Sequence, residues 1–177
     1  MQTRPRVSEL MRHAAEGSDA AFGELAQLAG PELLRFALAQ GLSATDAADA
    51  AQEALLRAFQ KRRSWQARGE AMCWLMGITL NVAREIHRRR RMASFDEMLL
   101  KDAKAPLAGA DMEAAEDLER LAGAMQGLPS RQREAIACRF LRRLSVQETA
   151  DVMGCAKGTV KSAVFTALAS LRQALGG

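Results

Sequence analysis

The sequence contains no tyrosine, only two tryptophans and six phenylalanines, and only two histidines in 177 residues. Domains rich in β-structure draw heavily on aromatic and β-branched residues, so this shortage, together with abundant Ala and Leu, predicts an all-α protein. His13 and His87 belong to no metal-ligand pattern, and the sequence has no phosphate-binding or dinucleotide glycine motif. We therefore expect no enzymatic activity, no metal site and no cofactor.

Cysteines and long apolar runs are also scarce. The three cysteines, Cys73, Cys138 and Cys155, are too far apart in sequence for a zinc knuckle or a redox pair, and we expect them to be reduced. No run reaches the ~18 apolar residues of a membrane span, and the first residues lack the apolar segment of a secretion signal. These absences predict a cytoplasmic protein without membrane insertion.

The formal net charge of +4 conceals an alternation along the chain. Residues 57–91 carry ten Lys and Arg against two Asp and Glu, and residues 120–177 carry nine against three. Residues 1–56 and 92–119 are both net acidic. Two basic blocks separated by an acidic one suggest two surfaces for a polyanion. Ordinary solvated helix faces would give the same pattern, so charge alone leaves both interpretations open.

Hydrophobic periodicity predicts a helical bundle of three or four helices over residues 5–92. Apolar side chains recur at helical spacing in residues 18–40, where Pro31 indicates a break or a first-turn position. A second helix is expected to start at Ser43 or Thr45 and to end near Lys61. A third is expected from about Glu70 to Arg91.

Residues 93–117 have no clear period, contain Pro106 and are acidic, so we expect a flexible linker. A second helical domain is expected over residues 118–177. Its first helix opens at Ser130 and should carry Ile136 and Phe140 into a core.

The end of the chain shows a helix-turn-helix pattern. Ser145 and Glu148 have the spacing of a capping box, and Gly154 suits a left-handed C-cap before a final helix over residues 158–175. On that helix one apolar stripe should face the core, formed by Val160, Val164, Leu168, Leu171 and Leu175. The opposite face carries Ser162, Thr166 and Gln173, with Lys161 and Phe165 on a flank. A second helix with small polar side chains suits a major groove, although a plain bundle helix has the same period.

Particular residue motifs favour the DNA-binding interpretation over a plain helical bundle. In the last third of the chain these motifs are Leu128-Pro129-Ser130-Arg131-Gln132-Arg133-Glu134, the pairs Leu144-Ser145 and Met153-Gly154, and Gly158-Thr159-Val160-Lys161-Ser162. They resemble region 4 of the sigma-70 family of RNA polymerase sigma factors. Motifs in the first half of the chain resemble region 2 of the same family. They are Asp49-Ala50-Ala51-Gln52-Glu53, Leu56-Arg57-Ala58-Phe59, Trp74-Leu75, Asn81 and the run Arg88 to Arg91. Since only these two regions are present, the chain resembles the extracytoplasmic-function (ECF) group.

The resemblance implies three sets of binding residues. Asp49, Gln52, Glu53, Leu56 and Phe59 would bind core RNA polymerase, at the clamp of its largest subunit. Trp65, Asn81, Arg84, Arg88, Arg89 and Arg90 would contact the −10 element of promoter DNA. Arg131, Arg143, Lys157, Thr159, Lys161, Ser162, Phe165 and Thr166 would contact the −35 element, with Arg133 and Arg142 also near phosphates. For Trp65 we favour the alternative, a core plug under its loop.

The resemblance also implies a contact with the flap of the second-largest polymerase subunit and control by an anti-sigma factor. Departures from the family pattern lie on the last helix, where Ala163, Phe165 and Thr166 replace common basic residues and Ala156 replaces a common serine N-cap. They predict an unusual promoter sequence or a region 4 held mainly by a regulator. A conventional helix-turn-helix repressor and a sigma-like adaptor that binds only regulators remain competing interpretations.

Overall fold

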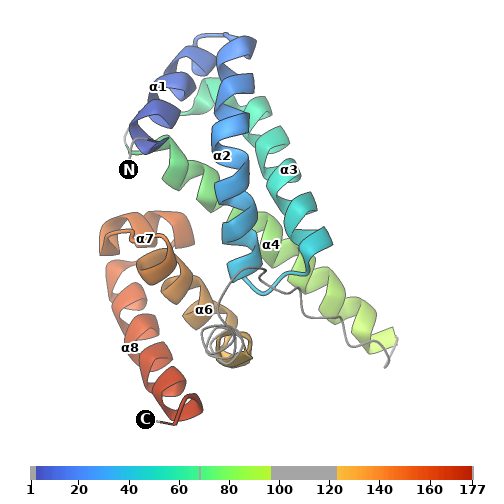
Figure 1. Cartoon of the computed structure of the whole chain (residues 1–177), viewed down its shortest axis with the longest axis vertical. Coiled ribbons are helices and arrows are strands. Elements are labelled where there is room, and N and C mark those ends of the chain that lie inside the picture. The colour runs from blue at the N-terminus through green and yellow to red at the C-terminus, as the bar shows by residue number, and fades with distance from the viewer. Residues whose placement is uncertain (1–2, 68, 97–122, 177) are drawn as a thin grey trace, which may run out of the picture.

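The structure is a computed structural model that describes residues 3–67, 69–96 and 123–176, and helices are its only regular elements in that part of the chain (Figure 1). The predicted all-α class is confirmed. The elements are α1 (Thr3–Ala15), α2 (Asp19–Ala39), α3 (Ala44–Lys61), the 3-10 turn η1 (Arg62–Ser64), α4 (Ala71–Asp96), α6 (Ser130–Ile136), the π-helical segment η2 (Ala137–Leu141), α7 (Val146–Met153) and α8 (Lys157–Ala174). From residue 97 on, the expected linker lies outside the described residues.

Helices α1 to α4 form the first bundle, which we call the front half, and α4 continues well beyond it at its C-terminal end (Figure 1). Short polar side chains start these helices. The Ser43 hydroxyl accepts from the Asp46 amide at 3.2 Å, so Ser43 rather than Thr45 is the N-cap of α3. Across the bundle, the Ser8 hydroxyl of α1 accepts from the Ala71 amide at the start of α4.

Pro31 does not interrupt helix α2, and the expectation of a break or first-turn position there is wrong. Helix α2 runs through it without interruption over 21 residues. An internal proline removes one hydrogen bond and costs about 3 kcal/mol. Buried side chains on both sides of it offset that cost, because the fully buried Leu25, Ala29, Leu33 and Phe36 fix both halves of the helix against the core.

The second half, α6 to α8, contains the expected helix-turn-helix. The Ser145 hydroxyl accepts from the Glu148 amide at 3.1 Å while the Glu148 carboxylate accepts from the Ser145 amide at 2.7 Å, so the predicted capping box is confirmed. Gly154 ends α7 with φ of 63°, the left-handed conformation that glycine adopts without strain. We call the segment from α6 to α8 the rear half.

Phe140 does not enter the core, and that prediction is wrong. Its side chain is 52% exposed, because the helix widens to π-helical geometry over Ala137–Leu141, where the Arg142 amide bonds to the Ala137 carbonyl. The wider turn rotates the later residues relative to an α-helical wheel. Cys138 is buried instead, in the main core.

The apolar stripe of α8 is also narrower than predicted. Val160, Ala167 and Leu171 are buried, Val164 is half-buried, and Leu168 and Leu175 are exposed. The real stripe is centred on the small Ala167, which allows α8 to lie close to α6. Leu168 and Leu175 fall at the edge of the stripe, beyond the width that the short helices α6 and α7 cover.

The two halves share one core. A single cluster of buried side chains joins residues of α1, α2 and α4 to Cys138, Leu144, Met153 and Val160 of the rear half. Helix α7 packs across α4, and Figure 1 shows the rear half beside the front bundle. None of the described helices combines the length and apolar composition that crossing a membrane requires.

Candidate polymerase and nucleic-acid interfaces

A groove of roughly 640 Å³ lies between α3 and the C-terminal part of α4. Asp49, Gln52, Glu53 and Leu56 line its α3 side, because residues three, four and seven apart share one helix face. Leu56 is 60% exposed, and Val82 and Ile86 add apolar surface from α4. The groove therefore combines apolar surface with acidic and amide groups and with the arginines Arg57, Arg89 and Arg90.

Arg57 fixes the geometry of this groove. Its guanidinium donates to both oxygens of Glu85 at 2.8 and 2.9 Å and to Glu53 at 2.7 Å. The hydrogen bonds from Arg57 lower the pKa of the Glu85 carboxyl. Since α3 and α4 are joined through this arginine, the Glu53 carboxylate has a defined position before any partner arrives.

Phe59 lies outside the groove, unlike the other four residues predicted to bind polymerase. Its ring packs edge-to-face on Phe22 of α2 with centroids 5.1 Å apart, and the Arg62 guanidinium lies 3.7 Å above the ring centre. These contacts stabilise the bundle. The structure thus assigns Phe59 to the packing of the front half.

The predicted −10 residues are distributed over α4 and the loop before it. Asn81, Arg88 and Arg89 are exposed, while Trp65 is half-buried against the main core. Arg90 forms an ion pair with Asp46 at the start of α3. Arg84 is bonded to Glu134 of the rear half.

The predicted −35 residues on α8 all lie on the exposed surface of the helix. Lys157, Thr159, Lys161, Ser162, Phe165 and Thr166 are all exposed, and Phe165 is 78% exposed. The Thr166 hydroxyl donates to the Ser162 carbonyl at 2.9 Å. Arg131 and Arg143 are exposed in the first turn of α6 and in the turn before α7. Arg143 adopts a positive φ of 52°.

Helix α8 begins without a side-chain cap. Ala156 has the extended conformation of an N-cap residue, and its carbonyl accepts from the Val160 amide, but its methyl side chain cannot accept a hydrogen bond from the first turn. We expect Ala156→Ser to raise the free energy of unfolding by about 1 kcal/mol. The same change at the exposed interior position Ala169 should lower it by about 0.5 kcal/mol. Urea unfolding of both variants checks the difference, and equal effects would contradict an uncapped α8.

Arg133 and Arg142, expected near phosphates, instead contact the front half. Arg133 donates to the Gln40 carbonyl at 2.9 Å, and Arg142 donates to the Glu32 carbonyl at 2.6 Å. Burial lowers the pKa of both guanidinium groups. Gly41, with φ of 81°, leaves room for this arrangement, because a Cβ there would overlap the Arg133 guanidinium.

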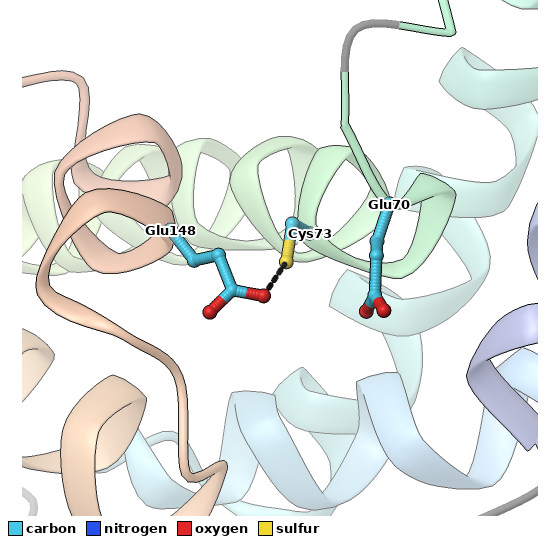
Figure 2. A group of neighbouring side chains, drawn as sticks. All are labelled: Glu70, Cys73 and Glu148. Atoms are coloured by element: carbon cyan, nitrogen blue, oxygen red, sulfur yellow. Dashed lines mark hydrogen bonds between the residues drawn. The ribbon is translucent and has the colours of Figure 1, made fainter.

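Glu70, Cys73 and Glu148 meet where the N-terminal end of α4 faces α7 (Figure 2). One ligand atom from each lies within 4.8 Å of the others, so the three are a candidate metal group that sequence spacing did not indicate. Burial raises the pKa of the Cys73 thiol to about 12, and this protonated group donates to Glu148 at 3.8 Å. Glu148 already completes the capping box, and Arg4 lies 3.6 Å from Glu70. In this structure the group acts as one more contact between the halves.

The sequence did not predict the α4 side of the groove. It also did not predict the partners of Arg84, Arg133 and Arg142. The ion pair between Glu53 and Arg57 could have been predicted, because the two residues are four apart on one helix. The groups that the arginines reach on other helices, namely Glu85, Glu134, Gln40 and Glu32, lie 28 to 110 positions away in the chain, and no local pattern connects them.

Comparison with known proteins identifies the family. The region 2 family of sigma-70 factors matches residues 25–92, and the region 4 family matches residues 124–173. The chain is 34% identical to the ECF RNA polymerase sigma factor EcfG of Rhodopseudomonas palustris, over 80% of this chain and 77% of that one. It is 32% identical to the ECF sigma factor SigM of Mycobacterium tuberculosis, over 96% and 84% of the two chains.

Two solved structures resemble both halves of the chain. CnrH in complex with the cytosolic domain of CnrY has a TM-score of 0.73 and 26% identity, covering 96% of this chain and 97% of that one. The sigma factor RpoE of Bartonella quintana, in complex with the anti-sigma factor NepR, has a TM-score of 0.75 and 28% identity, covering 87% and 96%.

The chain belongs to the sigma-70 family, within its ECF RNA polymerase sigma factors. The predicted family is confirmed, and with it the general function of a transcription factor that acts with RNA polymerase in transcription initiation.

Proposed function

We propose that the groove between α3 and α4 binds the clamp of the polymerase largest subunit, through Asp49, Gln52, Glu53 and Leu56. The observation that carries this proposal is the exposed Leu56 beside the acidic and amide groups of Asp49, Gln52 and Glu53, of which Glu53 is held by Arg57. An apolar anchor surrounded by polar groups is the usual composition of a binding hot spot. The acidic rim would pair with basic groups of the partner.

Promoter DNA would be bound by both halves. The exposed Asn81, Arg88 and Arg89 of α4 would contact the −10 element, and the outward face of α8 would enter the major groove of the −35 element. Two modest contacts joined in one chain gain from effective concentration. The proposed domains are residues 5–92 and 118–177, with residues 93–117 as the linker between them.

We also propose that an anti-sigma factor controls the chain. The structures of CnrH and RpoE are complexes, the second with an anti-sigma factor by name. This chain resembles both over more than four-fifths of its length. In keeping with its family, the protein would act by binding, without catalysis of its own, in the cytoplasm.

Transcription with reconstituted holoenzyme tests the proposal. Promoters selected by holoenzyme should give defined transcript starts that are absent with core polymerase alone. A gel-shift on the same duplexes separates the competing interpretations, because a conventional repressor would bind duplex DNA without core. A sigma-like adaptor would give no transcript. Absence of both core binding and transcript would reject the proposal.

Lys161→Ala should weaken holoenzyme binding to the selected promoter and reduce the slope of log affinity against log salt by about 0.9, the value for one phosphate contact on duplex DNA. The control is Lys61→Ala, which removes an exposed lysine at the end of α3. Titration at several salt concentrations measures both slopes. A slope unchanged by Lys161→Ala would remove this lysine from the DNA contacts.

A further inference from the structure

Helix α4 presents a face to the groove with the same residue spacing as the face of α3. Its lining residues lie three, four and seven positions apart along one side of the helix, and they are Val82, Glu85, Ile86 and Arg89. Arg90 also lines the groove and pairs with Asp46 at the start of α3. The neighbouring Arg88 is exposed, but it does not belong to the groove lining. The basic run at the end of α4 is therefore divided between two surfaces.

Four charged side chains of alternating sign span the groove from α3 to α4. The Glu53 carboxylate accepts from Arg57 at 2.7 Å, and Arg57 donates to both oxygens of Glu85 at 2.8 and 2.9 Å. Arg89 extends the series at 3.9 Å from Glu85. The Arg57 side chain is 30% exposed, whereas that of Arg89 is 74% exposed. The series thus ends on α4 in a positive charge whose long, exposed ion pair stabilises it only weakly.

The opposite wall of the groove ends in a negative charge. Asp49 is exposed on α3 and forms neither a hydrogen bond nor an ion pair with any residue that the structure describes. Leu56, Val82 and Ile86 supply apolar surface to the same groove. A partner that fills the groove would therefore meet an unsatisfied carboxylate on one wall, apolar side chains, and the weakly paired Arg89 on the other wall.

We infer that Arg89 is a polymerase-docking residue, which pairs with a carboxylate on the segment of the polymerase clamp that fills the groove. Charges covered by an interface are tolerated when each meets an opposite charge. That segment therefore carries a basic group toward Asp49 and an acidic group toward Arg89. The inference rests on the proposed docking groove and revises one residue of the proposed −10 set, because it leaves Asn81 and Arg88 with DNA.

DNA fits the position of Arg89 less well than a protein segment does. Four carboxylates line the same groove, those of Asp46, Asp49, Glu53 and Glu85. A phosphate backbone carries charge of one sign only, so it would be repelled by these groups while it approached Arg89. A protein segment can carry both signs and satisfy both walls. Arg88 lies about 100° further round the helix, away from the carboxylates of α3.

Binding to core RNA polymerase without DNA tests the assignment, because phosphate contacts cannot contribute. The matched variants are Arg89→Glu and Arg88→Glu, which make the same charge reversal one position apart on one helix. We expect Arg89→Glu to weaken core binding about tenfold, since the new carboxylate would face a carboxylate. Arg88→Glu should change core binding by less than about twofold at physiological salt, and should instead weaken promoter binding by the holoenzyme.

Two further variants separate docking from folding. Arg89→Gln removes the charge without placing a carboxylate beside Glu85, and should weaken core binding about threefold. Arg89→Lys keeps the charge and should restore most of the affinity. Urea unfolding of the free variants checks the fold, and all of them should unfold within about 0.5 kcal/mol of the wild type, as expected for changes at an exposed position.

The outcomes distinguish the inference from the proposed function. Equal losses of core binding in the Arg88 and Arg89 variants would overturn the inference, because they would reflect only the general field of the basic run. Normal core binding by Arg89→Glu, together with weakened promoter binding, would return Arg89 to the DNA contacts. If Leu56→Asp loses core binding while Arg89→Glu retains it, the groove stands and only the inference fails. If both retain core binding, the proposed docking groove itself is rejected.

Discussion

Leu56→Asp should reduce promoter-directed transcription about thirtyfold or more while leaving the fold intact. Leu56 lies at the groove between α3 and α4 and is 60% exposed, so the free protein loses almost no buried surface when it is changed. In the complex with polymerase an aspartate would be buried in an apolar contact, and hot-spot residues of this kind contribute 2 kcal/mol or more. Run-off transcription and core-binding titration measure the effect.

The matched control is Leu28→Asp on α2, another exposed leucine outside the groove. It makes the same chemical change, so any general effect of a new surface carboxylate would appear in both variants. Transcription by the Leu28 variant should equal that of the wild type. Equal losses in the two variants, or no loss at Leu56, would place the polymerase contact elsewhere on the chain.

Phe36→Ala should lower the free energy of unfolding by about 3–5 kcal/mol. Phe36 lies on α2 in the main core and is fully buried, so its removal deletes a large apolar contact and leaves a cavity. The same change at Phe165, on the outward face of α8, should alter stability by less than about 0.5 kcal/mol. Urea unfolding monitored by circular dichroism compares the two.

Phe165→Ala should nevertheless weaken promoter binding, since Phe165 belongs to the proposed −35 surface. The pair of variants therefore separates the two roles of phenylalanine in this chain, one in packing and one in recognition. A large loss of stability in Phe165→Ala would show that α8 presents a different face to the core. A small loss in Phe36→Ala would contradict the position of α2.

Features with local causes were predictable from the sequence. The capping box of Ser145 and Glu148, the left-handed Gly154 and the exposed face of α8 each depend on residues within one or two turns. Features with distant causes were not. Pro31 is tolerated because of burial supplied by other helices, and Phe140 is displaced by a π-helical turn that an α-helical wheel does not represent.

The candidate site divides in the same way. Asp49, Gln52, Glu53 and Leu56 were predicted from the resemblance to region 2, and their helical spacing is consistent with one face, whereas the α4 side of their groove depends on how two helices pair. Arg84 was identified as a basic side chain on a basic helix. Its bond to Glu134 joins residues 50 positions apart, and only the packing of the halves creates it.

Gly41 links the two halves in a way that would matter for chimeric sigma factors. Its left-handed backbone favours glycine, and the absent side chain leaves space for Arg133 from the other end of the chain. A chimera that joins this front half to a rear half without an arginine at the position of Arg133 would keep the space but not the side chain that fills it. Exchanging positions 41 and 133 as a pair should therefore preserve the fit that exchanging either one alone would lose.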